Sequence, residues 1–349
     1  MRSFLFLTVG CVGIYALPLF SAETQPTLPE RYLAIYMQMH DAENSEKQGR
    51  TEDALKGFQA CYDGLGAIHQ EDPGWEESLV VHRMHDCNVA IEKLEDVVAK
   101  AGAKTATTTG TIVQPVPATP SMVPPPADSP DITGSLVFTN SGPKPKNTYP
   151  WKTGIITTVF WIGEKTKLNN TWNLQVPPGG ASDDSPDDRN GYSPATHASF
   201  FNPFYVALPF NDLAYPDKAK QFLPAGWQRP DKDGKPVSAC IDRWVEIKTE
   251  DGSGHICYAQ WKDVGPFHND DADYVFGPGK EGPSQGAGLT VSPAVAQYLM
   301  LGTGKGKNTT RWRFIDAQDV PPGVWLKLEE QAIIYTAMHQ SKDATAKKK

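Results

Sequence analysis

The sequence predicts an α+β protein of two modules, in which N-terminal helices are joined by a Pro/Thr-rich linker to a C-terminal β-barrel. Three observations lead to this prediction. Apolar residues recur at helical spacing between residues 29 and 99. Seven prolines then fall within residues 113–130. Residues 151–335 hold many short β-branched and aromatic runs separated by Gly- and Pro-containing turns, a pattern typical of barrels.

The first 22 residues are typical of a signal peptide. Arg2 gives a positive start, a largely apolar stretch follows to Phe20, and Ser21-Ala22 offers small residues for cleavage. We therefore expect a secreted or periplasmic protein that meets the membrane only through this segment. The 33 basic and 41 acidic residues give a formal net charge of -8, which argues against a nucleic-acid partner.

Residues 29–99 are predicted to form three helices. Thr51 can cap the second helix, and Asp72-Pro73-Gly74 is a turn between the second and third helices. The spacing of Gly49, Ala54, Phe58 and Cys61 resembles a tetratricopeptide helical hairpin, over about one repeat and one further helix. The resemblance implies a module for a protein partner or for self-association, and a plain helical bundle without a partner is the alternative.

Residues 100–150 contain too little apolar area to fold and are predicted to be a semi-extended spacer. At the other end of the chain, residues 336–349 are expected to be a disordered, Lys-rich tail.

Four cysteines follow Cys11, two in each module, at Cys61, Cys87, Cys240 and Cys257. An even number in an exported chain predicts disulfides within the modules, with free buried thiols as the alternative. The first pair lies at similar distances before and after the 72–74 turn, so these two side chains are expected to meet. No spacing of Cys, His or carboxylates indicates a metal site, and no cofactor is predicted.

In the C-terminal module, a capped helix is predicted to begin at Ser292-Pro293, and Asp251-Gly252 suits a hairpin turn. Strands are predicted at residues 154–163, 204–210, 243–249, 255–262, 311–315 and 324–328, with short helices at 218–223 and 293–301.

Two motifs carry a family resemblance. Residues 263–267 read Asp-Val-Gly-Pro-Phe after a strand, and residues 289–292 read Leu-Thr-Val-Ser before the capped helix. Together they resemble the double-psi β-barrel of expansins and the rare lipoprotein A family, which act on polysaccharide. The chain departs from the family at Thr290, where the family has Asp, and the family's His has no match in Tyr205-Val206-Ala207, directly before Leu208-Pro209. The resemblance therefore leaves both a lytic transglycosylase-like enzyme and a non-hydrolytic, expansin-like protein open.

Glycan cleavage needs a proton donor and usually a second carboxylate. Asp263 is the candidate general acid, and a turn carboxylate bound by backbone amides is the alternative role for it. Aromatic neighbours could desolvate it or stack on a sugar. The candidate substrate-binding residues are Trp261, Phe267, Tyr205, Asp212 and Thr290.

The sequence thus predicts an exported cell-envelope protein that binds or acts on polysaccharide, with peptidoglycan as the expected ligand. The alternative is a non-catalytic scaffold that binds a protein partner through residues 29–99.

Overall fold

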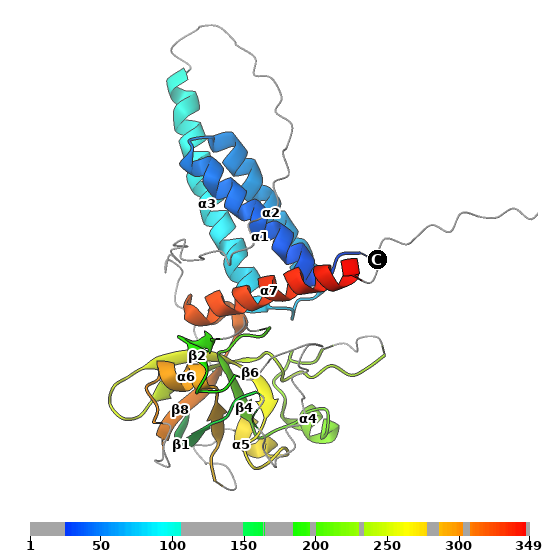
Figure 1. The fold of residues 1–349 in the computed structure, drawn as a ribbon, viewed down its shortest axis with the longest axis vertical. Coiled ribbons are helices and arrows are strands. Elements are labelled where there is room, and N and C mark those ends of the chain that lie inside the picture. The colour runs from blue at the N-terminus through cyan, green and yellow to red at the C-terminus, as the bar shows by residue number, and fades with distance from the viewer. Residues whose placement is uncertain are drawn as a thin grey trace, which may run out of the picture.

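The structure is a computed structural model in which two bodies, a helical bundle and a barrel, lie against each other (Figure 1). The predicted signal peptide (1–22) and most of the predicted linker (100–150) lie outside the described residues. The described residues are 25–105, 149–162, 164, 184–195, 200–229, 234–277, 286–302 and 308–346.

Three helices form the N-terminal bundle, as the sequence predicts: α1 (Leu28–Lys47), α2 (Thr51–Glu71) and α3 (Glu77–Thr105). Thr27 starts α1 with a reciprocal cap, because its backbone N–H donates to Glu30 Oε2 (2.8 Å) and the Glu30 N–H donates to its hydroxyl (3.5 Å). The predicted cap of α2 is wrong, since Thr51 is the first helical residue and the capping residue, Arg50, makes no side-chain cap.

Six strands close into a mixed barrel in the order β1-β7-β4-β6-β5-β8. The pairs β1–β7 and β4–β6 are parallel and the other four pairs are antiparallel. Closure gives every strand two neighbours and leaves no open edge. The barrel strands are β1 (Lys152–Val159), β4 (Tyr205–Leu208), β5 (Trp244–Thr249), β6 (Ile256–Val264), β7 (Leu289–Val291) and β8 (Asn308–Ile315). Outside the barrel lie the hairpin β2 (Arg189–Asn190) and β3 (Ser193–Pro194), with α4 (Pro216–Phe222), α5 (Ala272–Phe276), α6 (Pro293–Tyr298) and the 3-10 helix η1 (Ala317–Asp319).

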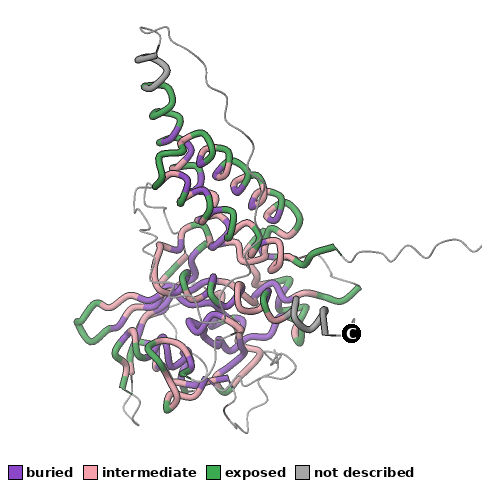
Figure 2. The backbone as a smooth tube through the Cα atoms, turned by 45° about the horizontal axis from the view of Figure 1, so that its top comes forward, coloured by how far each residue is buried: buried purple, intermediate pink, exposed green. Residues whose placement is uncertain are grey.

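The two faces of β4 point into different cores. Val206 and Leu208 belong to the main barrel core, whereas Tyr205 and Ala207 pack in a small separate cluster with Phe160. Figure 2 shows the buried residues gathered in the centre of the barrel and along the inner faces of the bundle. Since side chains alternate along a strand, β4 defines an inner and an outer face for the strands paired with it.

The last helix, α7 (Val324–Ala346), corrects two predictions. Residues 324–328 are helical where a strand was predicted, and most of the tail predicted to be disordered from residue 336 continues this helix. Tertiary packing explains the difference: Trp325 and Leu326 are buried in the barrel core, and Ile333 is buried in the core of the bundle. An apolar run of this length suits a strand or a buried helix equally well.

A buried charge network ties α7 to the bundle. The Glu330 carboxylate accepts two hydrogen bonds from Arg83, at 2.9 and 2.5 Å, and one from the Tyr32 hydroxyl at 2.7 Å. The Arg83 side chain is 1% exposed, so these charge-assisted bonds replace water as its main partners. The bundle and barrel are therefore joined by α7 directly, in addition to the segment between them.

Removing one partner of this network should destabilise the protein strongly. We expect Arg83→Met to lower the free energy of unfolding by about 3–5 kcal/mol, because it leaves a buried carboxylate without its cation. The matched control is Arg31→Met, which removes a partly exposed ion pair with Glu71 and should cost about 0–1 kcal/mol. Urea unfolding of both variants measures the difference, and equal losses would contradict the network's role.

Candidate functional site

Asp263 lies near the end of β6, at a register shift between β4 and β6. Val206 pairs with Trp261, but the next residue of β4, Ala207, pairs with Asp263. The extra residue in β6 is a bulge, which interrupts the alternation of side chains. Trp261 therefore faces the barrel core with Val206, while Asp263 lies on the opposite face with Ala207.

The same residue of β4 links the two sequence motifs. Ala207 pairs with Asp263 on one side and with Thr290 of β7 on the other. Thr290 in turn pairs with Thr158 of β1, and their hydroxyl oxygens lie 2.9 Å apart. Adjacent strands are about 4.8 Å apart, so the backbones of Asp263 and Thr290 are separated by roughly 10 Å. One row across three strands thus brings together the acid and the position where the family resemblance expects a second Asp.

The Asp263 carboxylate is mostly buried, with 6% of the residue exposed. Its Oδ1 atom accepts a hydrogen bond from the Val264 backbone N–H at 2.7 Å. The Trp261 indole N–H donates to the Asp263 carbonyl oxygen at 2.8 Å. These bonds fix the strand end, so the predicted turn role for Asp263 and a chemical role are compatible.

The exposed aromatic beside Asp263 is Phe267, which is 55% exposed. It follows the Gly265-Pro266 corner and adopts a left-handed backbone, with φ of 62°. Non-glycine residues in this conformation are strained and tend to occur at functional sites. Its ring packs against Gly286, where an added Cβ would lie 2.7 Å from the ring. An exposed ring held in place in this way is a suitable surface for stacking on a sugar.

Four of the five predicted substrate residues lie inside the fold. Trp261 is fully buried and stacks on Phe314 in the barrel core. The Tyr205 hydroxyl donates to Asp184 at 2.8 Å in the buried outer cluster. The Asp212 carboxylate accepts hydrogen bonds from the Ser238 hydroxyl at 2.7 Å and from the Ala239 backbone N–H at 2.6 Å, and so holds the loop before β5. Thr290 is also buried, with 5% of the residue exposed, so Phe267 is the exposed one of the five.

One acid of the segment just before β2 is held inside the fold. Asp184 is fully buried and pairs with Arg189, and its bond to Tyr205 braces the outer face of β4.

Among the described residues, no group of three His, Cys, Asp or Glu side chains is arranged to hold a metal ion. No helix in the described part of the chain combines the length and apolarity needed to cross a membrane.

The four described cysteines are free and buried in this structure, which does not bear out the predicted disulfides. The expectation that Cys61 and Cys87 meet is confirmed, because each thiol lies close enough to the other, across α2 and α3, to alter its pKa. The Cys61 thiol donates to the Ile35 carbonyl oxygen at 3.7 Å. Its closeness and burial raise the pKa of Cys87. Burial also raises the pKa of Cys240 and of Cys257.

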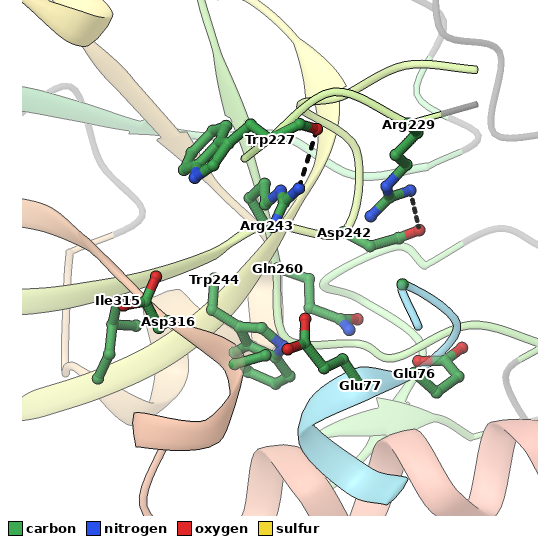
Figure 3. Close-up of a pocket in the computed structure, with 12 residues that line it drawn as sticks. Glu76, Glu77, Trp227, Arg229, Asp242, Arg243, Trp244, Gln260, Ile315 and Asp316 are labelled. Carbon is green, nitrogen blue, oxygen red and sulfur yellow. Dashed lines mark hydrogen bonds and ion pairs between the residues drawn. The ribbon is translucent and has the colours of Figure 1, made fainter. Parts of the chain in front are cut away.

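A second feature, which the sequence analysis missed, is a small cavity between the bundle and the barrel. Its volume is about 20 Å³, and it lies between the α2–α3 turn and the strands β5 and β6 (Figure 3). Glu76 and Glu77 come from the turn, while Arg229, Asp242 and Gln260 come from the barrel module. Neither Asp263 nor Phe267 lines it. These partners are far apart in sequence, so no local motif could have revealed the cavity.

Comparison of the chain with family models, with curated proteins and with solved structures gave no match.

The Gly286 contact predicts how the Phe267 ring responds to mutation. Gly286→Ala should cost about 1–2 kcal/mol in backbone strain at its positive φ and should also displace the ring. Gly191→Ala is the matched control, because Gly191 has a similar φ of 62° but open space around its Cβ position. We expect chymotrypsin to cleave after Phe267 faster in Gly286→Ala than in Gly191→Ala. Equal rates would show that the glycine does not hold the ring.

The thiol contact predicts a specific crosslink. Under a mild disulfide oxidant, Cys61 and Cys87 should join with the loss of two hydrogens, because their thiols face each other across α2 and α3. The closed loop should raise the free energy of unfolding by about 3 kcal/mol. Peptide mapping by mass spectrometry identifies the link, with Cys87→Ala as the control. A product that joins either residue to Cys240 or Cys257 would contradict this pairing.

Proposed function

We propose that this protein is an exported cell-envelope protein whose barrel binds polysaccharide, with peptidoglycan as the expected ligand. The observation that carries the proposal is the row in which Asp263 and Thr290 flank Ala207, with the exposed ring of Phe267 at the adjoining corner. A closed six-stranded barrel with two parallel strand pairs is the kind of architecture that a double-psi barrel of the expansin and rare lipoprotein A type requires.

Binding is the activity that this site supports best. Hydrolysis of a glycan by either stereochemical route uses two carboxyl groups. Thr290 occupies the second position with a hydroxyl that already pairs with Thr158. The nearby acids have other contacts, since Asp271 caps α5 and Asp270 pairs with Lys218 at 3.1 Å. A lytic reaction with Asp263 as its only acid is the alternative outcome.

A second candidate function is a scaffold that binds a protein through its helices. The far end of α3 extends beyond α1 and α2 (Figure 1), and α3 carries the exposed apolar residues Val89, Val97 and Val98. Contiguous exposed apolar residues mark interaction surfaces more often than scattered ones do. The tetratricopeptide resemblance of residues 29–99 implies the same kind of role.

A sedimentation assay of the full mature chain on insoluble peptidoglycan tests the proposal. Phe267→Ala should weaken binding about fivefold, because a stacked aromatic ring contributes about 1 kcal/mol. The control is Met300→Ala, which removes another exposed apolar side chain of the barrel module, 75% exposed.

The soluble fraction of the same assay distinguishes binding from cleavage. Binding without release of muropeptides, for the wild type and for Asp263→Asn alike, is the expected result. Release that is lost in Asp263→Asn would instead establish a lytic enzyme. If the wild-type chain does not sediment with peptidoglycan, the polysaccharide proposal is wrong and the helical surface becomes the site to pursue.

A further inference from the structure

Two carboxyl groups from different modules meet beside the cavity between the bundle and the barrel. Glu76 lies in the α2–α3 turn with a left-handed φ of 44°, and Glu329 lies on α7 and is 2% exposed. The Glu76 carboxyl is within hydrogen-bonding reach of Glu329. The Oε2 atom of each is buried, and neither receives a hydrogen bond from any donor in the described part of the chain.

Such a contact is stable only if it contains a proton. Two ionised carboxylates at this distance repel each other in a buried site, whereas one protonated carboxyl donates to the other and satisfies both oxygens. Burial, followed by the charge of Glu76 and the hydrogen bond with it, raises the pKa of Glu329 well above its usual range. Lys262 acts in the opposite direction, and Asp242 reinforces the increase.

The surrounding groups do not neutralise a second negative charge. Gln260 of β6 donates to Glu329 Oε1 at 2.7 Å, which occupies the other carboxyl oxygen. The Lys262 ammonium group is bonded to Asp242, whose other oxygen lies 3.9 Å from Arg229. Two further acids line the cavity, Glu77 and Asp316, and burial raises the pKa of Glu77. Five carboxylates around the cavity thus face three cations, those of Lys262, Arg229 and Arg243.

We propose that a proton shared by Glu76 and Glu329 latches the α2–α3 turn onto α7 and β6, and that its loss at alkaline pH releases the turn and opens the cavity. The positive φ of Glu76 fits this role, because a strained turn persists only while its contacts hold it. Glu330, the next residue of α7, binds Arg83 and Tyr32 and takes no part in this contact. The release is therefore local, and the bundle stays attached.

The direction of the pH effect follows from linkage. A carboxyl whose pKa is raised on folding contributes stability that is fully present below the pKa of the unfolded chain. That contribution decreases as the pH rises through the raised pKa of Glu329. The turn should accordingly be protected in acid and released in alkaline solution.

Hydrogen exchange of the full mature chain, followed by mass spectrometry, tests the latch. After correction for the intrinsic pH dependence of exchange, residues 72–80 should lose about tenfold protection between about pH 5 and about pH 9. Glu329→Gln should retain protection at both values, because its amide cannot ionise and can still donate to Glu76. Glu95→Gln, an exposed change on α3, should respond to pH like the wild type.

Two results would overturn the proposal. One is unchanged protection of residues 72–80 in the wild type across this pH range. The other is a pH response of Glu329→Gln equal to that of the wild type, which would assign the effect to another group such as Glu77 or His82. If Glu329→Gln does not fold, Glu76→Gln removes the same shared proton at the less buried of the two residues. Its hydrogen exchange then decides between the same outcomes.

Discussion

The extra residue in β6 determines how this molecule is organised. Without it, Trp261 and Asp263 would share one face of the strand by simple alternation. With it, Trp261 fills the barrel core, Asp263 lies beside Ala207 on the outer face, and Lys262 is free to bond to Asp242 at the border with the bundle. One strand therefore contributes both to the candidate binding site and to the contact between the modules. Bulges are common beside functional sites because they redirect side chains in this way.

The contact between the modules depends on buried charges that are matched across it. Burying ionised groups is costly unless each one is paired and hydrogen-bonded. Arg83, Tyr32 and Glu330 meet that condition within one network, and they fix the position of α7 on the bundle. Hydrophobic packing at two points along the same helix completes the attachment, through Trp325 in the barrel and Ile333 in the bundle. Because α7 is attached to both modules, the barrel corner at Phe267 keeps a fixed position relative to the far end of α3.

Much of the architecture could be predicted from local patterns. Helical periodicity predicted three N-terminal helices, and the Gly, Pro and Asp-Gly turns indicated a barrel of short strands. The secondary structure of residues 324–328 could not be predicted, because their apolar run fits a strand as well as a buried helix. The packing of Trp325 and Leu326 into the barrel core decides in favour of the helix.

The candidate site was only partly predictable, for similar reasons. The motifs indicated Asp263, Phe267 and Thr290, because Gly-Pro corners and helix caps are local features. The burial of Trp261 depends on a bulge, and the burial of Tyr205 depends on Asp184, which the sequence presents as part of an acidic loop. Glu76 and Glu329 come together only in the folded chain, so no spacing in the sequence links them.

The most direct test of the account is a titration of the ¹⁵N-labelled mature chain with soluble peptidoglycan fragments, monitored by NMR. The account predicts that chemical shifts change first at the backbone amides of Val264, Phe267 and Val291, around the row that joins Asp263 to Thr290. Changes confined to α1–α3, or no changes at fragment concentrations that saturate known peptidoglycan-binding proteins, would contradict it.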